Sequence, residues 1–403
     1  MSAITANKQG LRVLVTGSVL QLFLGIIYVW SEFVGPVSDR LGWDIAAVKL
    51  TSSFMLSFFV LGILTGGRLQ GRLGAHRVTL IGGLLLAAGM CAAAFVPTGA
   101  PWLIYVTYGI FGGFGVGMAY NAVISCAQKW FPLNRGFATG ISVCAFGFST
   151  VVFAPLVKWL LGSYGVKAAF LLLSGAFLAV VLALFSFIKL PNEAGAPGAA
   201  SAALLAKKQY TLKEVLVTKE FYFITLSLML GTAAFFILNP SFKTLAAERG
   251  LSGGMATGLV MLTGVANALG RLGVPLLSDK IGRNGGALVT LGATGACALA
   301  LCFAQGWAFM GTVALIAFCY GGFSGIYPVI TADYFGIRNV GSNYGAIMVG
   351  FALSALLFPM GIGLIGNGTV KFVVLGGFAL AGAGLVALLM AGTGKKQQAA
   401  IEQ

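Results

Sequence analysis

One arginine stands alone in a long apolar stretch. Residues 254–278 carry no charge except Arg271, whose guanidinium keeps its proton under ordinary conditions and is costly to place in hydrocarbon. Thr263, Asn267 and Arg271 follow one another at intervals of four residues, which on a helix predicts a single polar stripe. Such a stripe requires water or polar partners. The planar guanidinium suits a carboxylate, to which it can donate two parallel hydrogen bonds.

The sequence leaves two interpretations of Arg271 open. At about 12 Å from Asp279 along a helix, the side chain is long enough to extend to the membrane surface without binding anything. Alternatively, it lines a hydrated cavity and holds an anion, the use that arginines inside membranes commonly serve. We favour the anion site. A carboxylate would relieve part of the cost of the buried charge, about 2.5–3.5 kcal/mol, so bound substrate would permit the cavity to close.

The other reactive groups are too scattered to build an enzyme. The one histidine, His76, lies in a polar loop, and the six cysteines fall inside apolar segments without a CxxC pair. We therefore expect no enzymatic activity, no metal and no cofactor. Among the acidic residues only Glu32 and Asp333 lie inside apolar segments, each near an end, so Glu32 is the candidate for proton coupling. Protons that travel with the substrate as the neutral acid are the alternative.

Composition identifies a membrane protein built from helices. The chain is 58% hydrophobic and 9% charged, whereas a soluble domain is about 25% charged. Twelve apolar segments are each near or above the length of about 20 residues that crosses a bilayer as a helix, and the short alternating segments of a β-barrel are absent. This predicts an all-α integral membrane fold. The expected spans are 12–36, 46–70, 77–97, 101–127, 137–162, 167–189, 219–242, 254–278, 285–304, 308–333, 342–366 and 370–391.

The positive charges are distributed by side rather than gathered in one patch. The net charge is +15, and with the amino terminus inside, most of the 25 Lys and Arg residues fall in loops on the inner side. This obeys the positive-inside rule and argues against nucleic-acid binding. We expect a multi-pass protein of a bacterial-type inner membrane with both termini in the cytoplasm. The first apolar segment, about as long as a full span, reads as an anchor rather than a signal peptide.

The chain is expected to consist of two similar halves. Residues 191–218 form the one long polar break and predict a cytoplasmic linker between bundles 1–190 and 219–403. RLG at 72–74 corresponds to KIG at 280–282, at an offset of 208 residues. WF at 130–131 corresponds to YF at 334–335, at an offset of 204 residues. Two pseudo-symmetric six-helix bundles suit a transporter in which a central cavity opens alternately to each side.

These features resemble the major facilitator superfamily over nearly the whole chain. The basic loops GRLQGRLGAHR and PLLSDKIGR fit its loop pattern G-x-x-x-D-(R/K)-x-G, which implies a gating role for the loop residues. In the second loop Pro275 replaces the first glycine, and in the first loop Gly71 stands where the acid is expected. The charge lock attributed to that acid is therefore in doubt in the first half. The implied gating residues are Arg72, Gly74, Asp279, Lys280 and Gly282.

A narrower resemblance is to the oxalate:formate antiporter and monocarboxylate transporter branch. It rests on IYVWSEFVGP, YNAVISCAQKWFPLNRGFATG and NALGRLGVPLLSDKIGR, and it implies a small organic anion held by Arg271. Oxalate-exchanging members carry a lysine in helix eleven, but residues 343–358 contain no charge and Phe351 lies at the approximate position. Animal monocarboxylate transporters have an aspartate where Asn267 stands and a lysine in helix one, which is absent beyond Arg12. Their proton-coupling scheme therefore does not transfer unchanged.

The same resemblance implies where the walls of the binding pocket lie. Aromatic rings would accept an apolar tail, and hydroxyl or amide groups would accept or donate hydrogen bonds. For each tyrosine, packing in the core or at the membrane interface is the competing interpretation. The substrate-binding candidates are Arg271, Asn267, Tyr28, Tyr120, Asn121, Tyr320, Tyr327 and Phe351.

We therefore expect a secondary active transporter of small monocarboxylates that works by alternating access. L-Lactate is the first candidate substrate, with pyruvate, acetate, formate and glycolate next, and proton symport is the expected coupling. A single cation in the cavity suits a single carboxylate, which argues against oxalate. Anion exchange such as oxalate:formate antiport, multidrug efflux and a ligand sensor that does not transport are the alternatives. The protein is expected to act as a monomer in the lipid bilayer.

Overall fold

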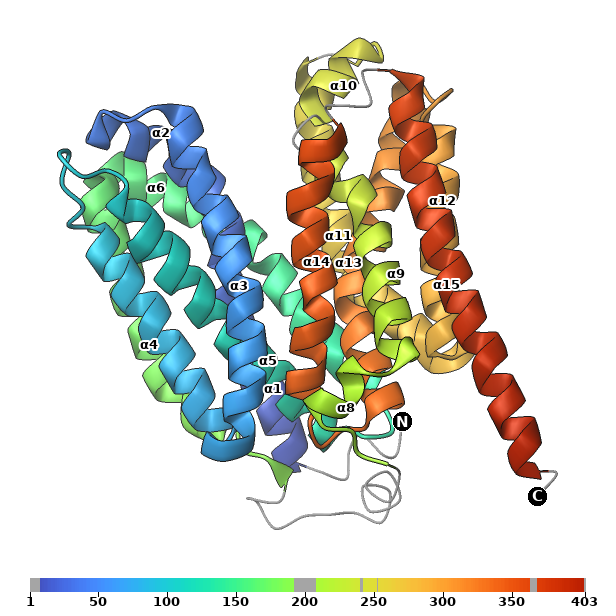
Figure 1. The fold of residues 1–403 in the computed structure, drawn as a ribbon. Coiled ribbons are helices and arrows are strands. Elements are labelled where there is room, and N and C mark those ends of the chain that lie inside the picture. The colour runs from blue at the N-terminus through green and yellow to red at the C-terminus, as the bar shows by residue number, and fades with distance from the viewer. Residues whose placement is uncertain (1–7, 192–207, 240–241, 252, 363–367, 402–403) are drawn as a thin grey trace. The chain divides into compact units, whose positions relative to one another are not determined.

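A computed structural model describes residues 8–191, 208–239, 242–251, 253–362 and 368–401. Over these ranges the chain is helical and contains no strand (Figure 1). The contacts between helices divide the chain into two compact units. The first unit contains residues 1–210 and 335–346, and the second contains residues 211–334 and 347–403.

The first unit begins with a helix that changes its winding. α1 (Lys8–Leu24) passes through a 3₁₀ turn, η1 (Gly25–Val29), into α2 (Trp30–Leu41). α3 (Ile45–Leu73) begins at Asp44, whose carboxylate accepts a hydrogen bond from the Ala47 amide as an N-cap. The remaining elements are α4 (Ala75–Ala93), a π-helical segment η2 (Tyr105–Gly112), α5 (Gly113–Trp130), α6 (Arg135–Leu184) and η3 (Phe185–Phe187).

Small residues allow the helices of the first unit to approach closely. α5 packs against both α3 and α4, which run beside it in Figure 1. A Cβ atom added at Gly117 of α5 would collide with the backbone oxygen of Phe59 in α3. Between helices in a bilayer, attraction depends on van der Waals packing, so such close backbone contacts stabilise the bundle directly.

The second unit contains eight helices among its described residues. α8 (Leu212–Leu216) begins with a capping box, in which Thr211 and Glu214 bond each other's backbone amides. α15 packs against α9 and α12. The elements that follow α8 are α9 (Lys219–Leu238), α10 (Phe242–Glu248), α11 (Gly253–Ile281), α12 (Arg283–Ala300), α13 (Gly306–Phe335), α14 (Val340–Ile362) and α15 (Thr369–Ile401).

Nine helices in the described residues are long and apolar enough to cross a membrane. One of them, Arg135–Phe187, covers two predicted spans and is interrupted at Gly165, whose φ of 75° no α-helix contains. α11 and α12 occupy the predicted spans 254–278 and 285–304 but are not among the nine. The expected count of twelve and the domain bounds 1–190 and 219–403 stay predictions. Most of the predicted linker, residues 192–207, lies outside the described residues.

Candidate functional site

Arg271 is buried in the second unit with its guanidinium held by a neighbour one turn away. Its side chain is 2% exposed, and its Nε donates a 3.0 Å hydrogen bond to Oδ1 of Asn267. Thr263, one further turn along α11, is also buried. Leu262 and Leu269, on the opposite face of the same helix, are exposed. The polar stripe therefore faces the interior of the unit and the apolar face is left for lipid.

Close contact between α11 and α13 fixes the position of this stripe. A Cβ atom added at Gly321 would collide with the Asn267 backbone oxygen, and one at Gly325 would lie 2.6 Å from that of Arg271. α13 thus carries glycine beside both site residues. Because no side chain separates the two backbones, Asn267 and Arg271 have little freedom to move away from α13.

Two of the candidate aromatic residues meet in the second unit, together with two that the sequence reasoning missed. Tyr320 of α13 stacks on Phe235 of α9 at 3.9 Å and lies 5.5 Å from Phe236, while Phe236 contacts Phe351 of α14 at 5.0 Å. We call Phe235, Phe236, Tyr320 and Phe351 the second-unit aromatic cluster. The FF dipeptide inside an apolar span was the available signal, but such pairs are common in membrane helices.

Tyr327 does not belong to this cluster. It is 1% exposed, its hydroxyl lies 2.8 Å from Oγ of Ser227, and its ring contacts Phe323 at 6.1 Å. A buried tyrosine with a partner for its hydroxyl is a satisfied core residue. Its geometry matches the packing interpretation better than a binding role.

In the first unit, Tyr28 and Tyr120 meet around Phe146. Their ring centroids lie 5.4 and 4.8 Å from that of Phe146, and Phe59 contacts Tyr120 at 5.2 Å. Gln21, which the sequence reasoning missed, is fully buried and donates from Nε2 to the Tyr120 backbone oxygen at 3.1 Å. We call Tyr28, Phe59, Tyr120 and Phe146 the first-unit aromatic cluster.

The side-chain amide of Asn121 bonds to backbone carbonyl groups and is not open to a ligand. Its Nδ2 donates to the carbonyl oxygens of Ile63 at 2.7 Å and Gly341 at 2.8 Å. Both acceptors belong to the first unit, because residues 335–346 group with it. A buried amide that bridges two chain segments has a structural explanation without substrate.

Glu32 lies in the first turn of α2 and is partly buried. It belongs to the first unit, whereas Arg271 belongs to the second. The other acidic residue inside a predicted span, Asp333, is occupied by an ion pair.

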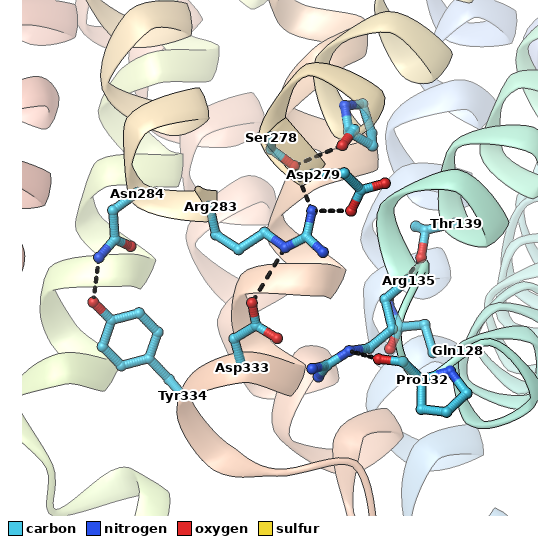
Figure 2. A network of polar contacts seen from close by, with 11 residues as sticks. Gln128, Pro132, Arg135, Thr139, Ser278, Asp279, Arg283, Asn284, Asp333 and Tyr334 are labelled. Atoms are coloured by element: carbon cyan, nitrogen blue, oxygen red, sulfur yellow. Dashed lines mark hydrogen bonds and ion pairs between the residues drawn. The ribbon is translucent and has the colours of Figure 1, made fainter. Parts of the chain in front are cut away.

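A charge cluster joins α11, α12 and α13 at their ends, as Figure 2 shows. The Arg283 guanidinium pairs with Asp279 one turn earlier and with Asp333 at 3.2 Å, and it donates to Oγ of Ser278 at 2.8 Å. Asn284 adds a bond to the Tyr334 hydroxyl at 2.7 Å. Two carboxylates pair with one arginine, and the network ties three helices.

The two predicted gating loops share one backbone turn. Gly74 between α3 and α4 has φ 80°, and Gly282 between α11 and α12 has φ 82°, a left-handed conformation that favours glycine. Arg72 and Lys280 precede these glycines and are exposed. Asp279 has its partner in Arg283, but at the equivalent place in the first loop stands Gly71.

Within the described residues no group of three or more His, Cys, Asp or Glu side chains lies together to hold a metal ion. The six cysteines are free thiols. The described residues therefore offer one buried arginine in each unit, Arg135 and Arg271, together with two aromatic clusters and one charge network at the ends of three helices.

The class of protein to which this arrangement belongs follows from comparison with protein families. The model of the Major Facilitator Superfamily matches residues 13–359. The chain belongs to the major facilitator superfamily. Its family and fold are those of multi-pass membrane transporters, not of enzymes. The fold predicted from the sequence is thereby confirmed.

Individual relatives fall in the branch that the motifs indicated. The oxalate:formate antiporter of Oxalobacter formigenes is 30% identical over 355 residues, covering 84% of this chain and 80% of that protein. Monocarboxylate transporter 13 of Rattus norvegicus is 27% identical over 383 residues, covering 92% and 85%. The solved fucose:proton symporter of E. coli shares the fold, with a TM-score of 0.70 over 95% of this chain and 99% of that one at 15% identity. The predicted resemblance is confirmed.

Proposed function

We propose that this superfamily member is a secondary active transporter of small monocarboxylates, with L-lactate as the first candidate, and that Arg271 binds the carboxylate. The observation that carries the proposal is the buried guanidinium, 2% exposed and oriented by Asn267. A permanent charge at this depth is costly unless an anion compensates it. The oxalate:formate antiporter and monocarboxylate transporter 13 are both named for carboxylates, which supports the same class of substrate.

The residues of α14 favour a substrate with one carboxylate over a substrate with two. Residues 343–358 of α14 contain no cation, and Phe351 lies there in contact with Phe236. A second carboxylate would face aromatic rings, whereas a short alkyl chain would gain contact with them. Tyr320, 6% exposed within the same cluster, is the proposed hydroxyl partner for the substrate.

Coupling to protons completes the proposal. A guanidinium without an anion resists being sealed inside dry protein, and a bound carboxylate would remove that resistance, so the charge favours transport by alternating access. Either Glu32 carries the proton or the substrate enters as the neutral acid. The expected setting is a bacterial-type inner membrane, with both termini in the cytoplasm and the monomer as the working unit.

The test is uptake of radiolabelled L-lactate into liposomes that hold the purified protein. With an inward proton gradient and no internal substrate, wild-type protein should accumulate lactate, and Arg271→Gln should abolish accumulation. Lys219→Gln, which removes an exposed charge at the start of α9, is the matched control and should transport normally. Unchanged uptake by Arg271→Gln would refute the role of this residue.

The relative named an oxalate:formate antiporter makes exchange the second candidate function. The same liposomes distinguish the two, since an exchanger takes up labelled anion only when vesicles are preloaded with unlabelled anion. Saturable lactate binding without flux under either condition would instead indicate a sensor.

A further inference from the structure

A cavity at the end of α3 carries two arginines, Arg68 and Arg72, the second of which belongs to the first predicted gating loop. It has a volume of about 410 Å³ and is lined by Thr65, Arg68, Leu69, Arg72 and Ser342, all within the first unit. Arg68 and Arg72 lie one turn apart on the same helix face, both exposed. Two guanidinium groups, which only donate, and two hydroxyl groups, which can donate, surround one space, and this set suits an anion with several oxygens.

The equivalent region of the second unit shows what is missing here. There, Arg283 pairs with Asp279 and Asp333. At the offsets of the internal repeat, Asp279 corresponds to Gly71, Arg283 to Ala75 and Asp333 to Lys129, so no carboxylate of this network has an equivalent in the first unit. Neither Arg68 nor Arg72 forms an ion pair with a carboxylate in the part of the chain that the structure describes. Among the described residues, the cations of this cavity therefore lack a carboxylate partner.

The surface next to the cavity indicates which class of anion binds there. Phe54 and Leu61 of α3 are 37% and 48% exposed, and in a membrane protein such residues face acyl chains. Phe54, Leu61 and Arg68 are spaced by seven residues, so one stripe of α3 runs from apolar side chains into the arginine pair. A ligand that matches this stripe has an apolar tail and an anionic head.

We propose that this cavity binds the phosphate headgroup of an anionic phospholipid, held by Arg68 and Arg72, with its acyl chains along Leu61 and Phe54. Arginine forks bind phosphate oxygens in pairs, and Thr65 and Ser342 can donate further hydrogen bonds. The charge distribution of the sequence puts this end of α3 at the cytoplasmic surface, where anionic lipids attract basic residues. The site is separate from the substrate site and does not depend on its identity.

Native mass spectrometry of the full-length protein tests the proposal. The protein is extracted from vesicles of phosphatidylethanolamine and phosphatidylglycerol, and the fraction that retains phosphatidylglycerol is measured. Arg68→Gln and Arg72→Gln should each lower retention about fivefold. Arg77→Gln, which removes an exposed charge of α4 outside the cavity, should not. Equal retention in the cavity variants and wild type, or an equal loss with Arg77→Gln, would overturn the site.

A second variant tests the site with every arginine in place. A Cβ atom added at Gly71 meets open space, so Gly71→Asp fits and puts a carboxylate three residues after Arg68. It should lower phosphatidylglycerol retention as far as the arginine variants do, and retention equal to wild type would overturn the proposal. Competition with inorganic phosphate distinguishes a lipid headgroup from a soluble anion. If phosphate displaces the lipid and protects the protein against heat equally well, the cavity takes a soluble anion and the lipid assignment is wrong.

Discussion

The hydrogen bond between Arg271 and Asn267 is the contact that organises the candidate site. The donor is Nε of the guanidinium, so the bond orients the guanidinium plane against the side chain one turn earlier. An aspartate at position 267 would form an ion pair with the arginine, whereas the amide of Asn267 is neutral and orients the guanidinium without pairing its charge. This is the physical difference between Asn267 and the aspartate that animal monocarboxylate transporters have at the same position.

Replacing Asn267 tests the orientation of the Arg271 guanidinium without changing its charge. In Asn267→Ala the guanidinium remains buried but loses its partner, so carboxylate binding should weaken by about tenfold, the value of one hydrogen bond to a charged group. The measurement is KM for L-lactate in the liposome assay. Thr290→Ala, which removes a buried hydroxyl bonded only to Gly286 of its own helix, is the control. An unchanged KM in Asn267→Ala would mean that Asn267 does not position the arginine.

At the scale of helices, hydropathy was sufficient to place most of the chain. The break between predicted spans 137–162 and 167–189 coincides with the left-handed Gly165. The 3₁₀ turn Gly25–Val29 and the π-helical segment Tyr105–Gly112 were not predicted, because hydropathy reports burial and not winding.

Contacts between distant segments were likewise beyond the sequence. The Tyr320 ring stacks on Phe235, 85 positions earlier, and Asn121 bonds to Gly341, 220 positions later. Periodicity identifies the face on which a residue lies but not the residue that meets it. The spacing of Asn267 and Arg271 was informative because a single helix determines it.

Glycine contacts between helices yield a prediction on stability. Gly117→Ala puts a methyl group against the Phe59 backbone oxygen, so α3 and α5 must separate, at a cost of about 1–3 kcal/mol. A lower midpoint of thermal unfolding in detergent is expected. Gly162→Ala is the matched control, because a Cβ atom there meets nothing and alanine favours a helix. Equal midpoints for the two variants would show that the α3 and α5 contact adds no stability.

At the scale of the whole molecule, the repeat explains both the resemblance of the halves and their divergence. Both loops turn at a left-handed glycine, Gly74 or Gly282, but the carboxylates that pair with Arg283 beside the second loop have no equivalents beside the first. A shared backbone with different charges means that the two loops interact with different surroundings. The charges of the second loop pair within the chain, and for the first loop we propose an anionic lipid as the partner.

The sidedness of the chain follows from the same charges and is open to a direct test. Most of the Lys and Arg residues fall in loops that would share one side with both termini, and the positive-inside rule assigns that side to the cytoplasm. An epitope tag after Gln403 should therefore resist protease in intact spheroplasts. A tag inserted between Pro97 and Thr98, in the turn that follows α4, should be cleaved. Lysed cells, in which both tags are cut, provide the control. The opposite pattern would invert the topology and move the cavity of Arg68 and Arg72 to the outer surface, where the electrostatic reason for lipid binding would no longer hold.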